Sequence, residues 1–229
     1  MVGLLIIILV SWLLLHFLDK TSIEGLGLLP KSERIKNNSF GLLISIICCL
    51  IYFGSLILLS KSSLKINKEY GLFAALNSLG WTTKSVLFEE FLFRGVLLYF
   101  GIKYFGTKTA CIISAIAFGV YHWFSYNIFG NVGQMIPVFI LTFVAGLLFA
   151  YSFVKTKSMY LQIGLHLGWN IVTIIVFSQG PLGHQYLIAS NGQQIGILMT
   201  LVLFAFQLLA LPILTLFYLN TSLYKSWKI

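Results

Sequence analysis

Seven apolar runs, each about as long as a bilayer is thick, divide this sequence. They cover residues 2–18, 40–60, 83–105, 109–124, 132–154, 159–178 and 195–219. An α-helix needs about 20 predominantly apolar residues to cross the hydrocarbon, where every backbone polar group must be satisfied internally. The sequence therefore predicts an all-α, polytopic transmembrane helix bundle of about seven spans. Residues 71–80 are apolar but too short to span, so we expect a short interfacial or re-entrant segment there.

The composition excludes a soluble domain of this length. Only 9% of the 229 residues are charged and 59% are hydrophobic, whereas soluble domains carry about 25% charged residues. The first apolar run has no basic segment before it and no small-residue cleavage site after it, so we expect a retained helix and not a signal peptide. With no repeat or linker, residues 1–229 are predicted to form one integral membrane domain.

The net charge of +9 predicts an orientation in the membrane. In a polytopic chain such a charge reports lysine and arginine in cytoplasmic loops, so we expect membrane lipids as partners and no nucleic acid. With the N-terminus outside, only four loop lysines lie on the outer side: Lys61, Lys65, Lys68 and Lys84. This favours N-out, C-in topology. The richness in Ile, Leu, Phe, Lys and Asn is typical of a low-GC bacterium, so we expect a bacterial cell membrane.

Three charged residues lie close together deep inside the apolar run 83–105. Because a charge at the bilayer centre costs roughly 2.5–3.5 kcal/mol on insertion, Glu89, Glu90 and Arg94 mark a functional-site hypothesis. Glu90 and Arg94 are spaced i, i+4 and can pair on one helix face. Glu89 lies about 100° around the helix from Glu90, so it needs a partner on another helix or a proton. The alternative is a structural ion pair beside a neutral glutamic acid.

Two later runs carry polar residues at helical spacing. His122 lies near the end of the run 109–124, and His166 and Asn170 are spaced i, i+4 in the run 159–178. Glycines at 164 and 168 flank His166, and small residues let neighbouring membrane helices approach closely. Taken singly, these groups also fit a packed histidine and a hydrogen bond between helices.

The depths of these polar groups agree. Short turns make consecutive helices antiparallel neighbours, so Glu89, His122, His166 and Asn170 can meet in one half of the bilayer, away from the 106–108 turn. A carboxylate, two imidazoles and an amide at one depth indicate a site that activates water. Glu89 would be the general base, helped by His122. His166 and Asn170 would bind the oxyanion of a tetrahedral intermediate.

Three motifs in this order resemble a known family. They are Glu89-Glu90-x-x-x-Arg94, Phe118-x-x-x-His122 and His166-x-x-x-Asn170. Together they resemble the CPBP family, which comprises type II CAAX prenyl proteases and bacteriocin-processing or immunity proteins, also called Abi. The resemblance covers a core of about 83–178. It implies an intramembrane endopeptidase, a peptide hydrolase, whose site is lined by Glu89, His122, His166 and Asn170 and supported by Glu90 and Arg94.

The resemblance allows two kinds of chemistry, because the family is described both as metalloproteases and as metal-independent glutamate proteases. Glu89, His122 and His166 would fill three positions of a catalytic zinc site. However, the sequence has no H-E-x-x-H motif, and asparagine is a poor zinc ligand. We therefore expect Glu89 to activate water without an obligatory metal. A divalent metal such as zinc is the alternative.

The resemblance also implies two kinds of substrate. Eukaryotic members remove the last three residues of prenylated CAAX tails, whereas bacterial relatives are associated with bacteriocin clusters, self-immunity and peptide maturation. We expect the bacterial role, with a peptide or small-protein substrate such as a bacteriocin precursor. The loop charges place the site in the outer half of the membrane, whereas prenyl proteases act on cytosolic substrates.

Two other functions are compatible with the polar groups. One is a non-enzymatic bacteriocin immunity protein that acts by binding. The other is a proton-coupled transporter, since Glu and His chains also serve as proton relays. The isolated Pro137 and Pro212 disfavour the transporter, because transporters carry broken helices in matching pairs.

Overall fold

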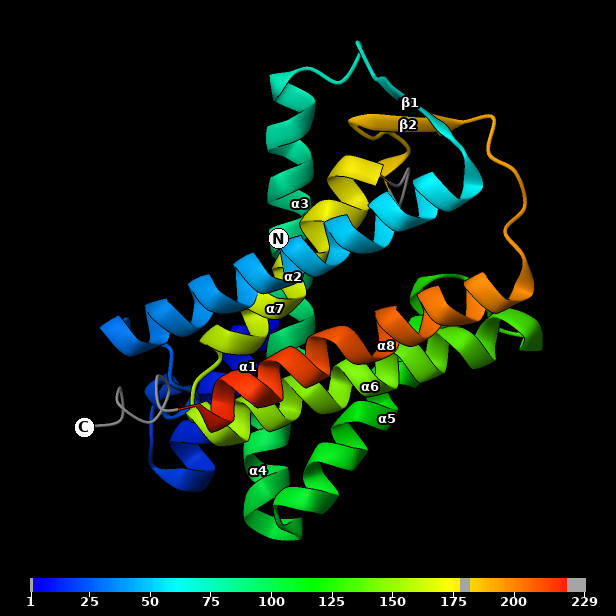
Figure 1. Ribbon diagram of the computed structural model, residues 1–229. Helices are drawn as coiled ribbons and strands as arrows, with labels where there is room; N and C mark the ends of the chain where they lie inside the picture. The colour runs from blue at the N-terminus through cyan, green and yellow to red at the C-terminus, as the bar shows by residue number, and fades with distance from the viewer. Residues whose placement is uncertain (1, 178–181, 222–229) are drawn as a thin grey trace.

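The computed structural model describes residues 2–177 and 182–221, and these form a helix bundle with one short sheet (Figure 1). Its α-helices are α1 (Val2–Asp19), α2 (Ser32–Ser60), α3 (Leu72–Arg94), α4 (Val96–Phe105), α5 (Thr107–Ser125), α6 (Val132–Thr156), α7 (Tyr160–Asn170) and α8 (Ile197–Asn220). The shorter elements are the 3₁₀-helix η1 (Ile23–Leu26), the π-helix η2 (Ile171–Phe177) and the strands β1 (Ser63–Ile66) and β2 (Leu187–Ser190).

Within the described ranges, five helices are long and apolar enough to cross a membrane. They are α1, α2, α6, α8 and the continuous segment of α7 and η2, Tyr160–Phe177. The predicted all-α polytopic membrane protein is thus confirmed. The expected spans at 83–105 and 109–124 are not among the five. They fall on α3 with α4 and on α5, whose charged and polar residues lower the mean hydropathy.

The prediction of a separate short segment at residues 71–80 was wrong. It is the beginning of α3, which starts at Leu72. The expected helix 83–105 is broken at Gly95, and α4 continues below α3 in Figure 1. A Cβ atom at Gly95 would lie 2.2 Å from the carbonyl oxygen of Phe91, so only glycine fits this break.

The loops also differ from expectation. Helix α2 already begins at Ser32, inside the region 19–39 expected as a polar loop. The two loops expected at 61–70 and 179–194 contain strands that pair antiparallel, with Ser63 opposite Ser190 and Ile66 opposite Leu187. Residues 178–181, at the end of the sixth predicted run and the start of this loop, lie outside the described residues. The sheet ties the loop after α2 to the loop after η2.

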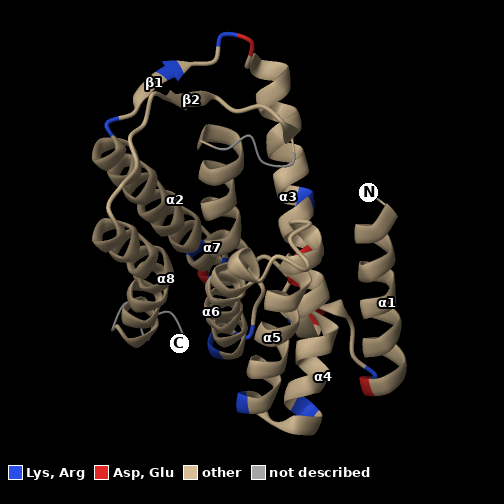
Figure 2. Cartoon of the chain, turned by 90° about the vertical axis from the view of Figure 1, so that its right-hand side faces the viewer, with Lys and Arg blue, Asp and Glu red and all other residues tan. Residues whose placement is uncertain are grey.

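Most charged residues lie at the helix ends and in the loops, but acidic residues also occur within α3 (Figure 2). These belong to the site described below. Around them the apolar core forms two clusters of buried side chains. One gathers Phe93, Phe118 and Phe149, and the other gathers Leu15, Phe91 and Met159.

Helices α2 and α7 pack closely because glycines line their contact. A Cβ atom would lie 2.7 Å from the carbonyl oxygen of Leu161 if placed at Gly41, 2.3 Å from that of Asn38 at Gly164, and 2.4 Å from that of Leu42 at Gly168. The expectation that Gly164 and Gly168 allow a close helix approach is confirmed. Because His166 lies between them, this contact fixes its depth and direction.

Substituting alanine for Gly164 or Gly168 is expected to destabilise the protein by about 1–3 kcal/mol, because the added methyl group would overlap backbone atoms of α2. Gly80→Ala is the matched control. It lies in a helix interior with nothing within 4 Å of the added Cβ, and alanine there should stabilise by about 0.5–1 kcal/mol. Thermal unfolding in detergent measures all three. Equal stability of Gly164→Ala and Gly80→Ala would contradict the close packing.

Candidate active site

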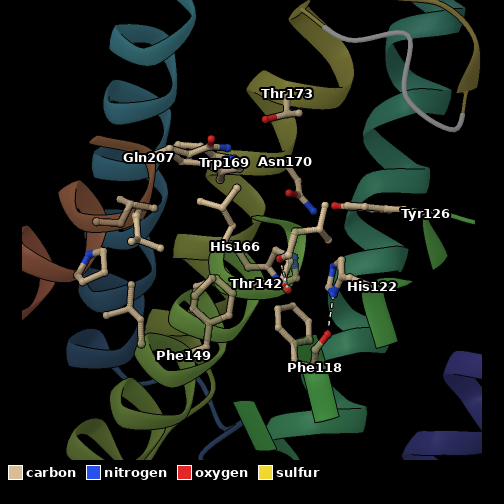
Figure 3. Close-up of a pocket in the computed structure, with 17 residues that line it drawn as sticks. Phe118, His122, Tyr126, Thr142, Phe149, His166, Trp169, Asn170, Thr173 and Gln207 are labelled. Carbon is tan, nitrogen blue, oxygen red and sulfur yellow. Dashed lines mark hydrogen bonds between the residues drawn. The ribbon is translucent and has the colours of Figure 1, made fainter. Parts of the chain in front are cut away.

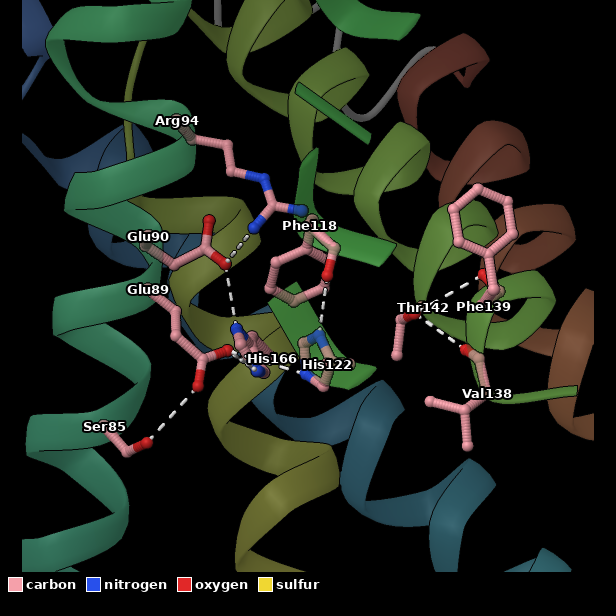
Figure 4. A network of polar contacts seen from close by, with 10 residues as sticks. All are labelled: Ser85, Glu89, Glu90, Arg94, Phe118, His122, Val138, Phe139, Thr142 and His166. Carbon is pink, nitrogen blue, oxygen red and sulfur yellow. Dashed lines mark hydrogen bonds and ion pairs between the residues drawn. The ribbon is translucent and has the colours of Figure 1, made fainter. Parts of the chain in front are cut away.

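Glu89, His122 and His166 come together from three helices, α3, α5 and α7 (Figure 4). The Oε2 atom of Glu89 lies 3.9 Å from Nε2 of His122 and 3.7 Å from Nε2 of His166. All three side chains are buried. Polar atoms separated by slightly more than a hydrogen bond are commonly bridged by water. The sequence prediction that these groups meet is therefore confirmed, and they meet with a gap between them.

The contacts of His122 fix which of its ring nitrogens faces Glu89. Its Nδ1 atom lies 2.8 Å from the carbonyl oxygen of Phe118. A carbonyl only accepts, so Nδ1 carries a hydrogen and donates it. In the neutral ring Nε2 then has a free electron pair, and this atom points toward Glu89. The rings of Phe118 and Tyr126, with centroids 4.5 Å and 5.1 Å away, hold the imidazole edge-on.

Glu90 connects His166 to Arg94. Its Oε1 atom accepts a hydrogen bond from Nη1 of Arg94 at 3.2 Å and lies 2.8 Å from Nδ1 of His166. The pairing of Glu90 with Arg94 was predicted from their spacing and is confirmed. The contact with His166 was not predicted. It orients the imidazole so that Nε2 faces Glu89, because a carboxylate bound to one ring nitrogen holds the ring in a fixed direction.

Aromatic rings enclose the guanidinium of Arg94, which has no exposed surface. Its Cζ atom lies 4.0 Å from the ring centroid of Phe118 and 5.1 Å from that of Phe149. Cations are attracted to aromatic faces, more strongly where water is excluded. No described residue hydrogen-bonds the Nε and Nη2 atoms of Arg94. Glu90 and the rings therefore compensate most of its charge.

The buried charges predict the number of protons in the cluster. Two ionised glutamates and one guanidinium leave a net charge of −1, and a buried net charge is costly. One additional proton makes the cluster neutral. The groups that can hold it are the carboxylate of Glu89 and the Nε2 atoms of His122 and His166, which face one another.

Besides Tyr126, two further side chains touch the site and were missed in the sequence. The hydroxyl of Ser85 donates to Oε1 of Glu89 at 3.4 Å. Its position one turn before Glu89 was a usable signal. The ring of Phe149 on α6 stacks on His166, with centroids 5.0 Å apart and planes 21° apart. No motif in the sequence marks Phe149, because its contact depends on how α6 packs against α7.

A cavity of about 230 Å³ lies beside the cluster, between α5, α6, α7 and α8 (Figure 3). His122, His166 and Asn170 line it, and the amide of Asn170 points into it. The remaining lining is largely aliphatic and aromatic. The structure thus brings all four predicted site residues to one place. Their catalytic roles remain predictions.

A metal ion would place strict requirements on the ligands of this cluster. Zinc sites take three or four ligands at about 2.0–2.3 Å. Within residues 2–177 and 182–221, no group of three or more His, Cys, Asp or Glu side chains is arranged to hold a metal ion. The proposed ligands Glu89, His122 and His166 do not fit a metal centre in this conformation. The proposed chemistry therefore uses side chains alone.

The fold and the site together define an integral membrane protein with a buried polar site beside an apolar cavity. Residues 70–172 match a family model described as Type II CAAX prenyl endopeptidase Rce1-like. The match covers a little under half of the chain and supports the resemblance to the CPBP family seen in the motifs. It includes all six predicted site residues and leaves out α1, α2 and α8. No curated protein and no solved structure matches the chain.

Proposed function

We propose that this protein is an intramembrane endopeptidase in which Glu89 activates a water molecule to attack a peptide bond. One observation carries the proposal. The carboxylate of Glu89 faces the Nε2 atoms of His122 and His166 across gaps of 3.9 and 3.7 Å, next to a cavity. The family match supports a CAAX-type endopeptidase activity.

In the first step Glu89 takes a proton from water. The Nε2 atom of His122 accepts a hydrogen bond from the remaining O–H, which keeps its hydrogen, and so directs the oxygen toward the substrate carbonyl. A correctly placed general base contributes about 100- to 10,000-fold to such a step. The water oxygen then bonds to the carbonyl carbon and gives a tetrahedral intermediate. Glu89 later returns its proton to the leaving amine as the C–N bond breaks.

The negative charge on the former carbonyl oxygen needs donors. His166 can supply one if it holds the extra proton of the cluster, because Glu90 stabilises the imidazolium through Nδ1. Its Nε2–H then donates to the oxyanion. The Asn170 amide, which points into the same cavity, supplies a second donor. Loss of one oxyanion donor typically costs about 100- to 1,000-fold in kcat.

We further propose a bacterial cell-membrane protein, N-out and C-in, that acts in peptide maturation or bacteriocin self-immunity. The loop charges support this orientation. The expected substrate is a peptide or small protein such as a bacteriocin precursor, presented from the outer half of the membrane.

The test compares wild type and Glu89→Gln at equal membrane levels. The host carries the peptide genes that lie next to the gene for this protein. Peptide products are identified by mass spectrometry while cell survival is recorded. We expect processing and survival to fall together in the variant. Unchanged processing would refute the peptidase. Survival without processing would identify a protein that protects by binding.

Metal removal gives a separate prediction. Treatment of the purified enzyme with 1,10-phenanthroline or EDTA is expected to leave peptide cleavage unchanged, because the proposed steps use only side chains. A serine protease inhibitor and a heat-denatured sample serve as controls for contaminating proteases. Loss of cleavage that zinc restores would instead assign a metal to Glu89, His122 and His166.

A further inference from the structure

A glutamine lies in the middle of the lipid-crossing helix α8. Helix α8 is among the five apolar spans, yet Gln207 sits halfway along it and its side chain lines the cavity (Figure 3). The family match ends at residue 172, so no motif accounts for this residue. A carboxamide at this depth is expensive unless it has a hydrogen-bond partner.

No described residue satisfies that carboxamide. Within residues 2–177 and 182–221, the side chain of Gln207 makes no hydrogen bond. In Figure 3 it lies on the opposite side of the cavity from His122 and extends toward the interior. Its donor and acceptor are therefore available to a bound molecule. The neighbouring Leu208 and Leu211 of α8 add apolar surface beside it.

A peptide substrate needs hydrogen-bond partners for its backbone. The segment to be cleaved must be extended, because a helix buries its carbonyl groups in its own hydrogen bonds. An extended backbone in the bilayer has unsatisfied N–H and C=O groups, which are tolerated only where protein or water satisfies them. A carboxamide offers one donor site and one acceptor site and therefore matches a peptide group.

The size of the cavity indicates which side chain of the bound peptide it can hold. At about 230 Å³ it is smaller than the roughly 300–1,000 Å³ of pockets that enclose drug-sized ligands. It fits one large aliphatic or aromatic side chain, and a long isoprenoid would extend out of it. The substrate class that fits the cavity is thus a peptide with a large apolar residue near the cleaved bond.

We propose that Gln207 is a specificity-determining residue that binds the backbone of this peptide, while the cavity holds the apolar side chain. This inference rests on the proposed peptidase function. It adds a binding group from α8, a helix outside the family match, to the cluster formed by α3, α5 and α7.

The test uses a fluorescent, leucine-containing peptide with the enzyme in nanodiscs, and measures Gln207→Leu against wild type. Leucine keeps most of the volume and removes the hydrogen bonds. We expect KM to rise about fivefold to tenfold, the equivalent of one hydrogen bond, with kcat nearly unchanged. Gln134→Leu, at the exposed start of α6 and outside the cavity, is the matched control and should leave KM unchanged.

A substrate analogue shows whether the contact is to the backbone. Each amide of the peptide is replaced in turn by an ester, which removes one N–H donor. At the contacted position the ester should weaken binding to wild type about fivefold to tenfold and have no further effect on Gln207→Leu. Equal losses in both proteins at every position would overturn the proposal, as would an unchanged KM in Gln207→Leu.

Binding measured without turnover separates this proposal from the proposed function. The Kd of the same peptide is determined on the Glu89→Gln background, with and without Gln207→Leu. If wild type cleaves no peptide but Gln207→Leu weakens binding, the peptidase fails and the binding residue stands. If cleavage depends on Glu89 but Kd does not depend on Gln207, only the present inference fails.

Discussion

Glu89→Gln is expected to lower kcat by about 100- to 10,000-fold, the contribution of a positioned general base. Glutamine has the same shape and keeps an acceptor for the Ser85 hydroxyl, which lies 3.4 Å from Oε1. It cannot accept a proton from water. Because the charges of Glu90 and Arg94 then balance without an additional proton, the variant should fold at least as stably as wild type. The loss is thus expected in chemistry and not in folding.

The measurement is peptide cleavage by purified protein, with thermal unfolding recorded on the same samples. Glu69→Gln, an exposed carboxylate in the loop before α3, removes a charge outside the site and should leave kcat unchanged. A Glu89→Gln enzyme that retains full kcat would exclude Glu89 as the base. A large drop in unfolding temperature would instead assign Glu89 a structural role and support the alternative of a structural ion pair.

The site residues were predictable because polar groups are costly in an apolar run. Glu89, His122 and His166 stand out against long stretches of Leu, Ile and Phe, so their positions carry information that they would not carry in a soluble chain. Helical spacing then gave the pair of Glu90 and Arg94, which the structure confirms at 3.2 Å. Antiparallel order brought the groups to one depth.

Contacts between helices were not predictable in the same way. Spacing fixes which residues share a face of one helix, but it does not fix how α7 is rotated relative to α3. The hydrogen bond from His166 to Glu90 and the stacking of Phe149 on His166 depend on that rotation. The glycines of α7 were a partial signal, since they indicate close approach without naming the partner helix.

The errors in the helix boundaries also have a tertiary origin. Gly95 looks like any glycine in an apolar run, and only the approach of the Phe91 carbonyl oxygen shows why the helix breaks there. Residues 71–80 are too short to span alone, yet they extend a helix that continues to Arg94. The strands β1 and β2 are each four residues long and pair across more than 100 positions, which no local pattern reveals.

Arg94→Met is expected to destabilise the protein by about 3–5 kcal/mol, because removing one partner of a buried ion pair leaves the other charge uncompensated. Glu90 is fully buried. Among its contacts in the described residues, Arg94 is the only partner that is permanently charged, because His166 is charged only when protonated. Methionine retains much of the packing against Phe118 and Phe149. Unfolding free energies from a denaturant titration in mixed micelles measure the change.

The double variant Glu90→Gln/Arg94→Met separates charge from packing. Glutamine still offers an oxygen to Nδ1 of His166, and no buried charge remains unpaired at this position. Replacing a whole buried ion pair by uncharged residues is often neutral or stabilising, so the double variant should recover most of the lost stability. If it is as unstable as Arg94→Met, the loss comes from the contacts of the guanidinium with the rings of Phe118 and Phe149.

Activity should not recover with stability. Without the carboxylate of Glu90, an imidazolium at His166 keeps only Glu89 as a charged partner, and the extra proton of the cluster shifts toward Glu89. A protonated Glu89 is no longer a base, so kcat of the double variant should stay low even though the protein folds. Recovery of both would mean that Glu90 and Arg94 only hold the helices together. Recovery of stability alone would show that the buried pair sets the protonation of the site.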